Sequence, residues 1–197
     1  MTGRGVDGPT GSGVLAQAMR TLIRDVPDFP EPGVVFKDIT PLLADHEAFS
    51  VAIEALADAG RGDDGLPAVD KVVGMEARGF ILAAPVALAL GAGFVPVRKA
   101  GKLPGATHAV SYSLEYGDAT LEMHQDAVQA GERVLLVDDV LATGGTVAAT
   151  TKLVETCGAT VTGVAVLLEL AFLRGREALG QELPLWSLAT VGAGTGA

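Results

Sequence analysis

Residues 134–146 of this 197-residue chain read VLLVDDVLATGGT. The four apolar residues at its start predict a strand that is buried on both faces, as is typical of parallel sheets. The adjacent acids Asp138 and Asp139 follow at its carboxyl end, where open α/β sheets bind ligands. Gly144 and Gly145 then permit unusual backbone angles before a predicted helix over 144–157. The run therefore predicts a strand–loop–helix unit of a parallel α/β sheet.

The same run carries the chemistry of a sugar-phosphate site. Backbone amides of a glycine-rich loop at a helix N-terminus suit a phosphate monoester. Two neighbouring carboxylates can accept hydrogen bonds from ribose hydroxyls and stabilise positive charge on the sugar ring. The alternative is that the acids only cap a strand and the glycines form a loose turn. The candidate ribose-phosphate residues are Asp138, Asp139, Ala142, Thr143, Gly144, Gly145 and Thr146.

Outward from this run, strand-length and helix-length apolar segments alternate. Helices are predicted over 14–25, 45–56, 80–90 and 144–157. Strands are predicted over 72–73, 94–98, 110–116, 119–124, 134–137, 160–168 and 185–191, with a hairpin turn at Gly117-Asp118. Such alternation predicts an α/β fold in which helices flank a parallel sheet on both sides. We expect two additions to that core: the hairpin and the segment 27–41, which is extended from residue 33. We also expect a single domain over 13–191, with the glycine-rich ends 1–12 and 192–197 as flexible tails.

Composition excludes several classes of protein. A hydrophobic content of 49% excludes intrinsic disorder, and 24 acidic against 14 basic residues, a net charge of −10, argue against a general nucleic-acid binder. Cys157 is the only cysteine, so an intrachain disulfide is excluded and a cytoplasmic location is favoured. Residues 79–97 carry no charge, but prolines and glycines interrupt them, so they predict a buried helix and strand rather than a membrane span. We expect no signal peptide, because the first residues lack an apolar segment.

Other motifs carry less information. Residues 3–8 match the dinucleotide-binding pattern G-x-G-x-x-G, but no predicted strand precedes them. The sequence contains no P-loop, H-E-x-x-H or G-x-S-x-G motif, and His46, His108 and His124 lack the spacing of metal ligands. We therefore expect no metal site that is built by the protein alone.

The run 134–146 resembles the phosphoribosyl-diphosphate signature of the type I phosphoribosyltransferases. Three further blocks make the chain similar to the adenine phosphoribosyltransferase family. Residues 29–41 (FPEPGVVFKDITP) look like its base-binding hood, about 27–41, and residues 74–80 (GMEARGF) look like its diphosphate loop. The segments RKAGKLPG and SYSLEYG, within about 98–124, resemble its mobile catalytic lid, about 99–124. The resemblance covers residues 14 to 190.

This resemblance implies a purine-salvage transferase that makes AMP and diphosphate from adenine and 5-phosphoribosyl 1-diphosphate. It implies Mg²⁺ that is carried by the substrate, since magnesium prefers phosphates and water as ligands. It also implies a homodimer, and a cis peptide bond between Glu76 and Ala77. Two alternatives stay open: transfer to another base (hypoxanthine, guanine, xanthine or orotate), and a non-catalytic regulator that senses phosphoribosyl diphosphate.

The resemblance further implies roles for single residues. Glu115 would handle a purine proton, and Asp138 and Asp139 would act in catalysis on the ribose. The diphosphate would be bound by Glu76, Ala77, Arg78, Arg98, Lys99 and Lys102. The base would be bound by Val35, Phe36, Lys37 and Leu170. Lys37 stands where the family often has an arginine, which leaves the role of its side chain open.

Overall fold

The computed structural model describes residues 11–113, 118–180 and 183–192. These residues fall into two compact units that divide between Ala55 and Leu56. The single domain expected over 13–191, with its hood and lid, stays a prediction. Glu115 lies outside the described residues, as do residues 1–10 and 193–197 of the expected tails.

The N-terminal unit combines helices with a small sheet. Its elements are α1 (Gly11–Thr21), β1 (Arg24–Pro27), β2 (Val35–Asp38), α2 (Thr40–Ala44) and most of α3 (His46–Ala57). Helix α3 begins as predicted, because the Asp45 carboxylate caps it by accepting a hydrogen bond from the Ala48 N–H at 2.9 Å. Helix α1 includes residues 11 and 12, which the sequence placed in the tail.

The prediction of one helix up to residue 25 is wrong. Helix α1 ends at Thr21, and β1 pairs antiparallel with β2. The chain turns back after β1 through Asp28, which has a φ of 55° and accepts a hydrogen bond from the Gly33 N–H at 2.7 Å. This turn lets β1 pair with β2, which begins eight residues after β1 ends, and the pairing overrides the local helical pattern.

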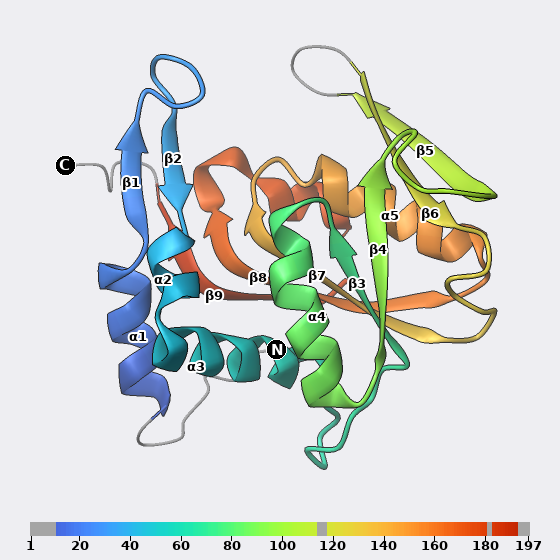
Figure 1. Cartoon of the computed structure of the whole chain (residues 1–197), viewed down its shortest axis with the longest axis horizontal. Coiled ribbons are helices and arrows are strands. Elements are labelled where there is room, and N and C mark those ends of the chain that lie inside the picture. Colours follow the sequence, from blue (N-terminus) through green and yellow to red (C-terminus); the bar gives the residue numbers. More distant parts are fainter. Residues whose placement is uncertain (1–10, 114–117, 181–182, 193–197) are drawn as a thin grey trace. The chain divides into compact units, whose positions relative to one another are not determined.

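Among the residues of the second unit that are described, seven strands form one sheet in the order β5-β6-β4-β3-β7-β8-β9 (Figure 1). Five are parallel: β3 (Lys71–Met75), β4 (Gly93–Lys99), β7 (Arg133–Leu141), β8 (Thr160–Leu170) and β9 (Leu185–Val191). The hairpin of β5 (Thr107–Ser113) and β6 (Asp118–His124) extends the sheet antiparallel beside β4. This arrangement confirms the predicted α/β class.

Helices α4 (Arg78–Leu90) and α5 (Gly145–Thr156) cover opposite faces of the sheet. Successive residues of a strand point to opposite faces. On β3, a Cβ at Gly74 would lie 2.8 Å from Ala83 of α4. Its neighbour Val73 packs instead in a buried cluster with Leu153 of α5. In Figure 1, α4 crosses in front of the sheet and α5 lies behind it, as the prediction of two helical layers requires.

Three short 3₁₀ helices complete the fold: η1 (Asp58–Gly60), η2 (Ala171–Leu173) and η3 (Gly175–Leu179). The sequence predicted none of them. In the part of the chain that is described, no helix has both the length and the apolar character needed to cross a membrane. The uncharged stretch 79–97 forms α4 and the first part of β4.

Several strand bounds differ from the prediction: β5, for example, is Thr107–Ser113 rather than 110–116, and β7 is longer than predicted. Strand β7 continues to Leu141, so Asp138 and Asp139 lie within it rather than after it. The reason is its neighbour β8, which supplies partners for β7 as far as Glu169, opposite Leu141. The predicted hairpin turn at Gly117-Asp118 is only partly described: Asp118 belongs to β6, where it pairs with Ser113, and Gly117 lies outside the described residues.

Candidate active site

The candidate site lies where the strand order of the parallel sheet reverses. The chain leaves β3 for β4 on one side and later returns to β7 on the other side of β3. Ligands of open α/β sheets bind beyond the carboxyl ends of the strands at such a switch point. The predicted diphosphate loop follows β3, and the acid pair lies near the end of the adjacent β7. The fold therefore brings these two predicted groups to one edge of the sheet.

The acid pair is packed against the first turn of α4. A Cβ on Gly79 would lie 2.8 Å from Asp138 Oδ1 and 3.0 Å from the Val137 carbonyl oxygen, so only glycine fits there. Asp139 is 5% exposed, and its Oδ2 lies 2.8 Å from the Nε of Arg78. Among the described residues, no hydrogen-bond donor is aligned with this Oδ2. The positive charge of Arg78 is therefore the main compensation for burying the Asp139 carboxylate.

Burial and a neighbouring negative charge determine the pKa of Asp138. Burial raises the pKa of Asp138 well above its usual value, and the negative charge of Asp139 raises it further. A hydrogen bond from the Asp139 N–H to Asp138 Oδ1, at 2.9 Å, opposes this shift. Positive charge in the site, such as that of a reacting sugar, would favour ionisation of Asp138.

The loop that follows β7 has the shape expected of an anion site. Gly144 adopts a left-handed conformation with φ of 84° at the N-cap of α5, a position that favours glycine. The first amides of α5 lack partners within the helix and can donate to a phosphate. Predicted residues Ala142, Thr143, Gly145 and Thr146 lie on this loop and the first turn.

Tyr112 of β5 lies against this loop, and it is not among the predicted site residues. Its Oη lies 3.1 Å from Thr146 Oγ1, and a Cβ on Gly145 would lie 3.0 Å from its ring. The two residues are 34 positions apart in the sequence, so no local sequence pattern predicts this contact. It links the hairpin expected to be a lid to the candidate phosphate loop.

Two of the predicted diphosphate cations, Arg98 and Lys102, pair with Glu76. The Glu76 carboxylate accepts hydrogen bonds from Lys102 Nζ at 2.6 Å, Arg98 Nε at 3.2 Å and the Lys99 N–H at 3.1 Å. Its side chain is 8% exposed, and these donors, Lys102 above all, lower its pKa below the usual value. The peptide bond between Glu76 and Ala77 is cis, which confirms that expectation. Arg98 and Lys102 thus lie near the end of β3, with the buried Glu76 carboxylate as their counter-ion.

The predicted base-binding residues lie in both units. Val35, Phe36 and Lys37 belong to β2, and Leu170 ends β8. Within the N-terminal unit, the Phe36 ring packs edge to face with Phe29, the centroids 5.1 Å apart. The Nζ of Lys37 lies 2.6 Å from Asp25 Oδ1, an ion pair inside the small sheet. The role of these residues in binding a base stays a prediction.

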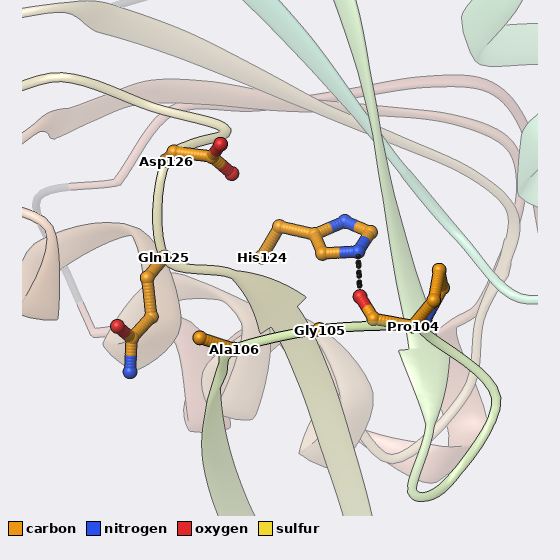
Figure 2. A pocket seen from close by; sticks show the side chains of 6 residues that line it. All are labelled: Pro104, Gly105, Ala106, His124, Gln125 and Asp126. Carbon is orange, nitrogen blue, oxygen red and sulfur yellow. Dashed lines mark hydrogen bonds between the residues drawn. The ribbon is translucent and has the colours of Figure 1, made fainter.

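The base of the hairpin carries a separate contact. His124 Nε2 lies 2.7 Å from the Pro104 carbonyl oxygen and ties the end of β6 to the loop between β4 and β5 (Figure 2). A surface groove here is lined by Pro104, Gly105, Ala106, His124, Gln125 and Asp126, none of which was predicted to bind substrate. Among the described residues, no group of three or more His, Cys, Asp or Glu side chains is placed to hold a metal ion.

A further carboxylate lies at the same edge of the sheet. Glu169, near the end of β8 and opposite Leu141 of β7, is 5% exposed. Both its oxygens accept hydrogen bonds from Arg176. Sequence reasoning missed this pair, although an acid at the end of an otherwise apolar strand was the available signal.

Known proteins match this architecture over nearly the whole chain. A family model described as the phosphoribosyl transferase domain matches residues 42–179. The adenine phosphoribosyltransferase of Nocardioides sp. is 68% identical over 184 residues, which cover 93% of this chain and 98% of that protein. The one from Streptomyces coelicolor is 58% identical over 186 residues, with 93% and 98% covered.

Solved structures agree with the relatives. The crystal structure of adenine phosphoribosyltransferase from Rhodothermus marinus is 50% identical, with a TM-score of 0.83 and coverage of 93% of this chain and 100% of that one. The Saccharomyces cerevisiae enzyme, complexed with an imino-altritol bisphosphate and adenine, is 39% identical, with a TM-score of 0.82 and coverage of 90% and 99%. Sequence, fold and length all agree, and this chain belongs to the adenine phosphoribosyltransferase family of type I phosphoribosyltransferases.

Proposed function

We propose that this chain transfers the 5-phosphoribosyl group of 5-phosphoribosyl 1-diphosphate to adenine, which gives AMP and diphosphate in purine salvage. A bond forms between a ring nitrogen of adenine and C1 of the ribose, and the bond from C1 to the diphosphate oxygen breaks. The observation that carries the proposal is the edge shared by β3 and β7, where a cationic loop lies beside an acid pair and a glycine-rich loop. Its chemistry suits one substrate with phosphates at both ends of a ribose.

The acid pair would act on the sugar. Asp138 and Asp139 would accept hydrogen bonds from the ribose hydroxyls and stabilise positive charge on the ring as the diphosphate departs. Burial raises the pKa of Asp138, and the positive charge that develops on the ribose as the diphosphate departs would favour the ionised form of that carboxyl.

The glycine-rich loop would bind the 5-phosphate. The amides of Ala142, Thr143, Gly144, Gly145 and Thr146 would donate to its oxygens, and the two threonine hydroxyls would add donors. The N-terminus of α5 contributes a favourable dipole at the same point. This contact would fix one end of the substrate.

The cationic loop would bind the diphosphate. Arg78, Arg98, Lys99 and Lys102 would supply the charge, and the backbone at Glu76 and Ala77 would turn toward the ligand. In the structure, Arg78 is paired with Asp139, and Arg98 and Lys102 with Glu76. The diphosphate would compete with these carboxylates for the same cations. We further propose that Mg²⁺ arrives on the substrate, where it neutralises diphosphate charge, since magnesium prefers phosphate oxygens and water.

The base would be held by Val35, Phe36, Lys37 and Leu170. Aromatic stacking on Phe36 and hydrogen bonds from main-chain groups would recognise the purine, which leaves the Lys37 side chain available for its ion pair with Asp25. Glu115 would handle the purine proton. We propose that these parts form one domain with a hood and a lid, and that the protein is a cytoplasmic homodimer; light scattering on the purified protein tests the dimer.

A product assay tests the reaction itself. The protein is incubated with phosphoribosyl diphosphate, Mg²⁺ and, in turn, adenine, hypoxanthine, guanine, xanthine or orotate. We expect AMP from adenine and little product from the other bases. Efficient turnover of another base would overturn the assignment of Val35, Phe36 and Leu170. Tight binding of phosphoribosyl diphosphate without any turnover would favour a sensor.

A further inference from the structure

An ion pair between the buried Glu169 carboxylate and the exposed Arg176 guanidinium lies beside the candidate phosphate loop; the two side chains are 6% and 52% exposed. The Glu169 carboxylate accepts hydrogen bonds from Arg176 Nε at 2.6 Å and Arg176 Nη2 at 2.7 Å. The Ser187 hydroxyl donates to the same carboxylate at 3.3 Å. Two parallel bonds from a planar guanidinium fix the position of Arg176 as well as its charge.

The residue before Arg176 lies directly against the loop. A Cβ on Gly175 would clash with the Ala142 carbonyl oxygen, and a Cβ on Gly144 would lie 2.5 Å from the Gly175 carbonyl oxygen. Both positions therefore require glycine, and the two backbone segments touch. Gly144 is the N-cap of α5, so this contact bears on the amides proposed to bind the 5-phosphate.

The segment that carries Gly175 needs an external restraint. Arg174, a non-glycine residue, has a left-handed φ of 53°, which local sterics disfavour. Its own side chain is 77% exposed and lies 4.0 Å from Glu177 in an exposed ion pair, which restrains the backbone little. The bond from Arg176 to Glu169 supplies the restraint, because Glu169 is fixed in β8 opposite Leu141, the last residue before the loop.

Charge points to the same role. The Glu169 side chain is 6% exposed at the sheet edge where a phosphate would bind. An unpaired carboxylate there would be costly and would repel the phosphate. Arg176 cancels this charge while it holds Gly175 in place.

We propose that Glu169 and Arg176 are positioning residues that fix Gly175 against Ala142 and Gly144, and thereby orient the amides of the phosphate loop. The inference rests on the proposed role of that loop. It predicts a selective effect on ligands that carry a 5-phosphate, namely phosphoribosyl diphosphate, AMP and ribose 5-phosphate. Adenine carries no phosphate, so its KM should change little.

The test compares Arg176→Gln with the neighbouring control Arg174→Gln. We expect Arg176→Gln to raise the KM for phosphoribosyl diphosphate and the Kd for ribose 5-phosphate by about ten- to a hundredfold, the effect of a misplaced binding group. The KM for adenine should stay within about twofold. Arg176→Lys should recover part of the loss, and the control should match the unmodified protein.

A second variant keeps the test decisive if Arg176→Gln folds poorly. Glu169→Leu combined with Arg176→Met removes both charges, so it leaves no unpaired carboxylate at the buried Glu169 position. If the pair positions the loop, the folded double variant should bind ribose 5-phosphate more weakly than the unmodified protein does. Normal binding by it would overturn the inference, as would equal rises in both KM values for Arg176→Gln.

The outcomes separate this inference from the proposed function. Adenine turnover by the unmodified protein, with unchanged ribose 5-phosphate binding in Arg176→Gln, would overturn the positioning role alone. An unmodified protein that neither makes AMP nor binds ribose 5-phosphate would overturn the proposed function and the inference together.

Discussion

The Nε of Arg78 lies 2.8 Å from the Oδ2 of Asp139, a carboxylate that is 5% exposed. The sequence assigns the arginine to the diphosphate and the acid to the ribose. Their contact joins the two halves of the candidate site through one ion pair. A change at Arg78 should therefore affect both the diphosphate and the acid pair.

Replacing Arg78 with Met should weaken substrate binding and stability together. Asp139 would lose its nearest positive charge, and an uncompensated buried carboxylate costs about 1–3 kcal/mol. We expect a lower free energy of unfolding in urea and a KM for phosphoribosyl diphosphate that rises at least about tenfold. Arg78→Lys should restore most of the stability but little of the KM, because lysine lacks the guanidinium fork. Full activity in Arg78→Met would contradict the assignment to the diphosphate.

The double change Asp138→Asn and Asp139→Asn should nearly abolish turnover in a folded protein. The two amides keep the size of the side chains but cannot offset positive charge on the ribose, so kcat should fall by about a hundredfold or more. Circular dichroism and thermal unfolding serve as the control for folding. Near-normal rates would remove the acid pair from the chemistry.

Some of this architecture follows from local sequence alone. The apolar run from Val134 predicts β7, because consecutive apolar residues are typical of a strand that is buried on both faces. The strand predicted over 185–191 is β9, with the same bounds. Asp45 predicts the start of α3 because a short acid can cap the first amides of a helix. The site edge could be foreseen because polar residues follow the apolar runs of both strands: Glu76 and Arg78 come after β3, and Asp138 and Asp139 come after Val134–Val137 in β7.

Other features depend on contacts distant in sequence. Strand β1 exists because it pairs with β2, and β7 is longer than its apolar run because β8 continues beside it. The bonds from Arg176 to Glu169 and from Tyr112 to Thr146 each require a fold before the partners meet. No periodicity encodes such pairs.

Gly79→Ala should disturb the acid pair without adding or removing a charge. The new Cβ would lie 2.8 Å from Asp138 Oδ1, so α4 or the carboxylate must move. We expect about 1–3 kcal/mol of lost stability, measured by urea unfolding, and a lower kcat. Gly13→Ala in α1 is the matched control, since nothing lies within 4 Å of its Cβ and alanine favours helices. Equal behaviour of the two variants would mean that the close packing at Gly79 does not constrain the acids.

Glu115→Gln addresses a residue outside the described part of the chain. A residue that moves a purine proton acts in the transition state, so kcat should fall by about a hundredfold while the Kd for AMP changes little. The matched control is Glu177→Gln, whose carboxylate is 73% exposed on η3. Equal losses in kcat and in AMP affinity would instead indicate a binding role.

The pair of Asp70 and Arg133 should make stability depend on acid pH. Arg133 donates to both oxygens of Asp70, and its backbone and side-chain hydrogen bonds lower the pKa of Asp70 from 3.8 to about 2. A carboxylate whose pKa is lower in the folded state stabilises the fold above pH 3.8, and this contribution is lost as the pH falls toward 2. Asp70→Asn should therefore lower Tm at pH 7, and the difference from the unmodified protein should shrink in scans at pH 4 and 3.

The effect should be modest and decrease with added salt, because the pair lies at the surface. A difference in Tm that stays constant from pH 7 to pH 3 would show that the pair's charge contributes nothing to the fold.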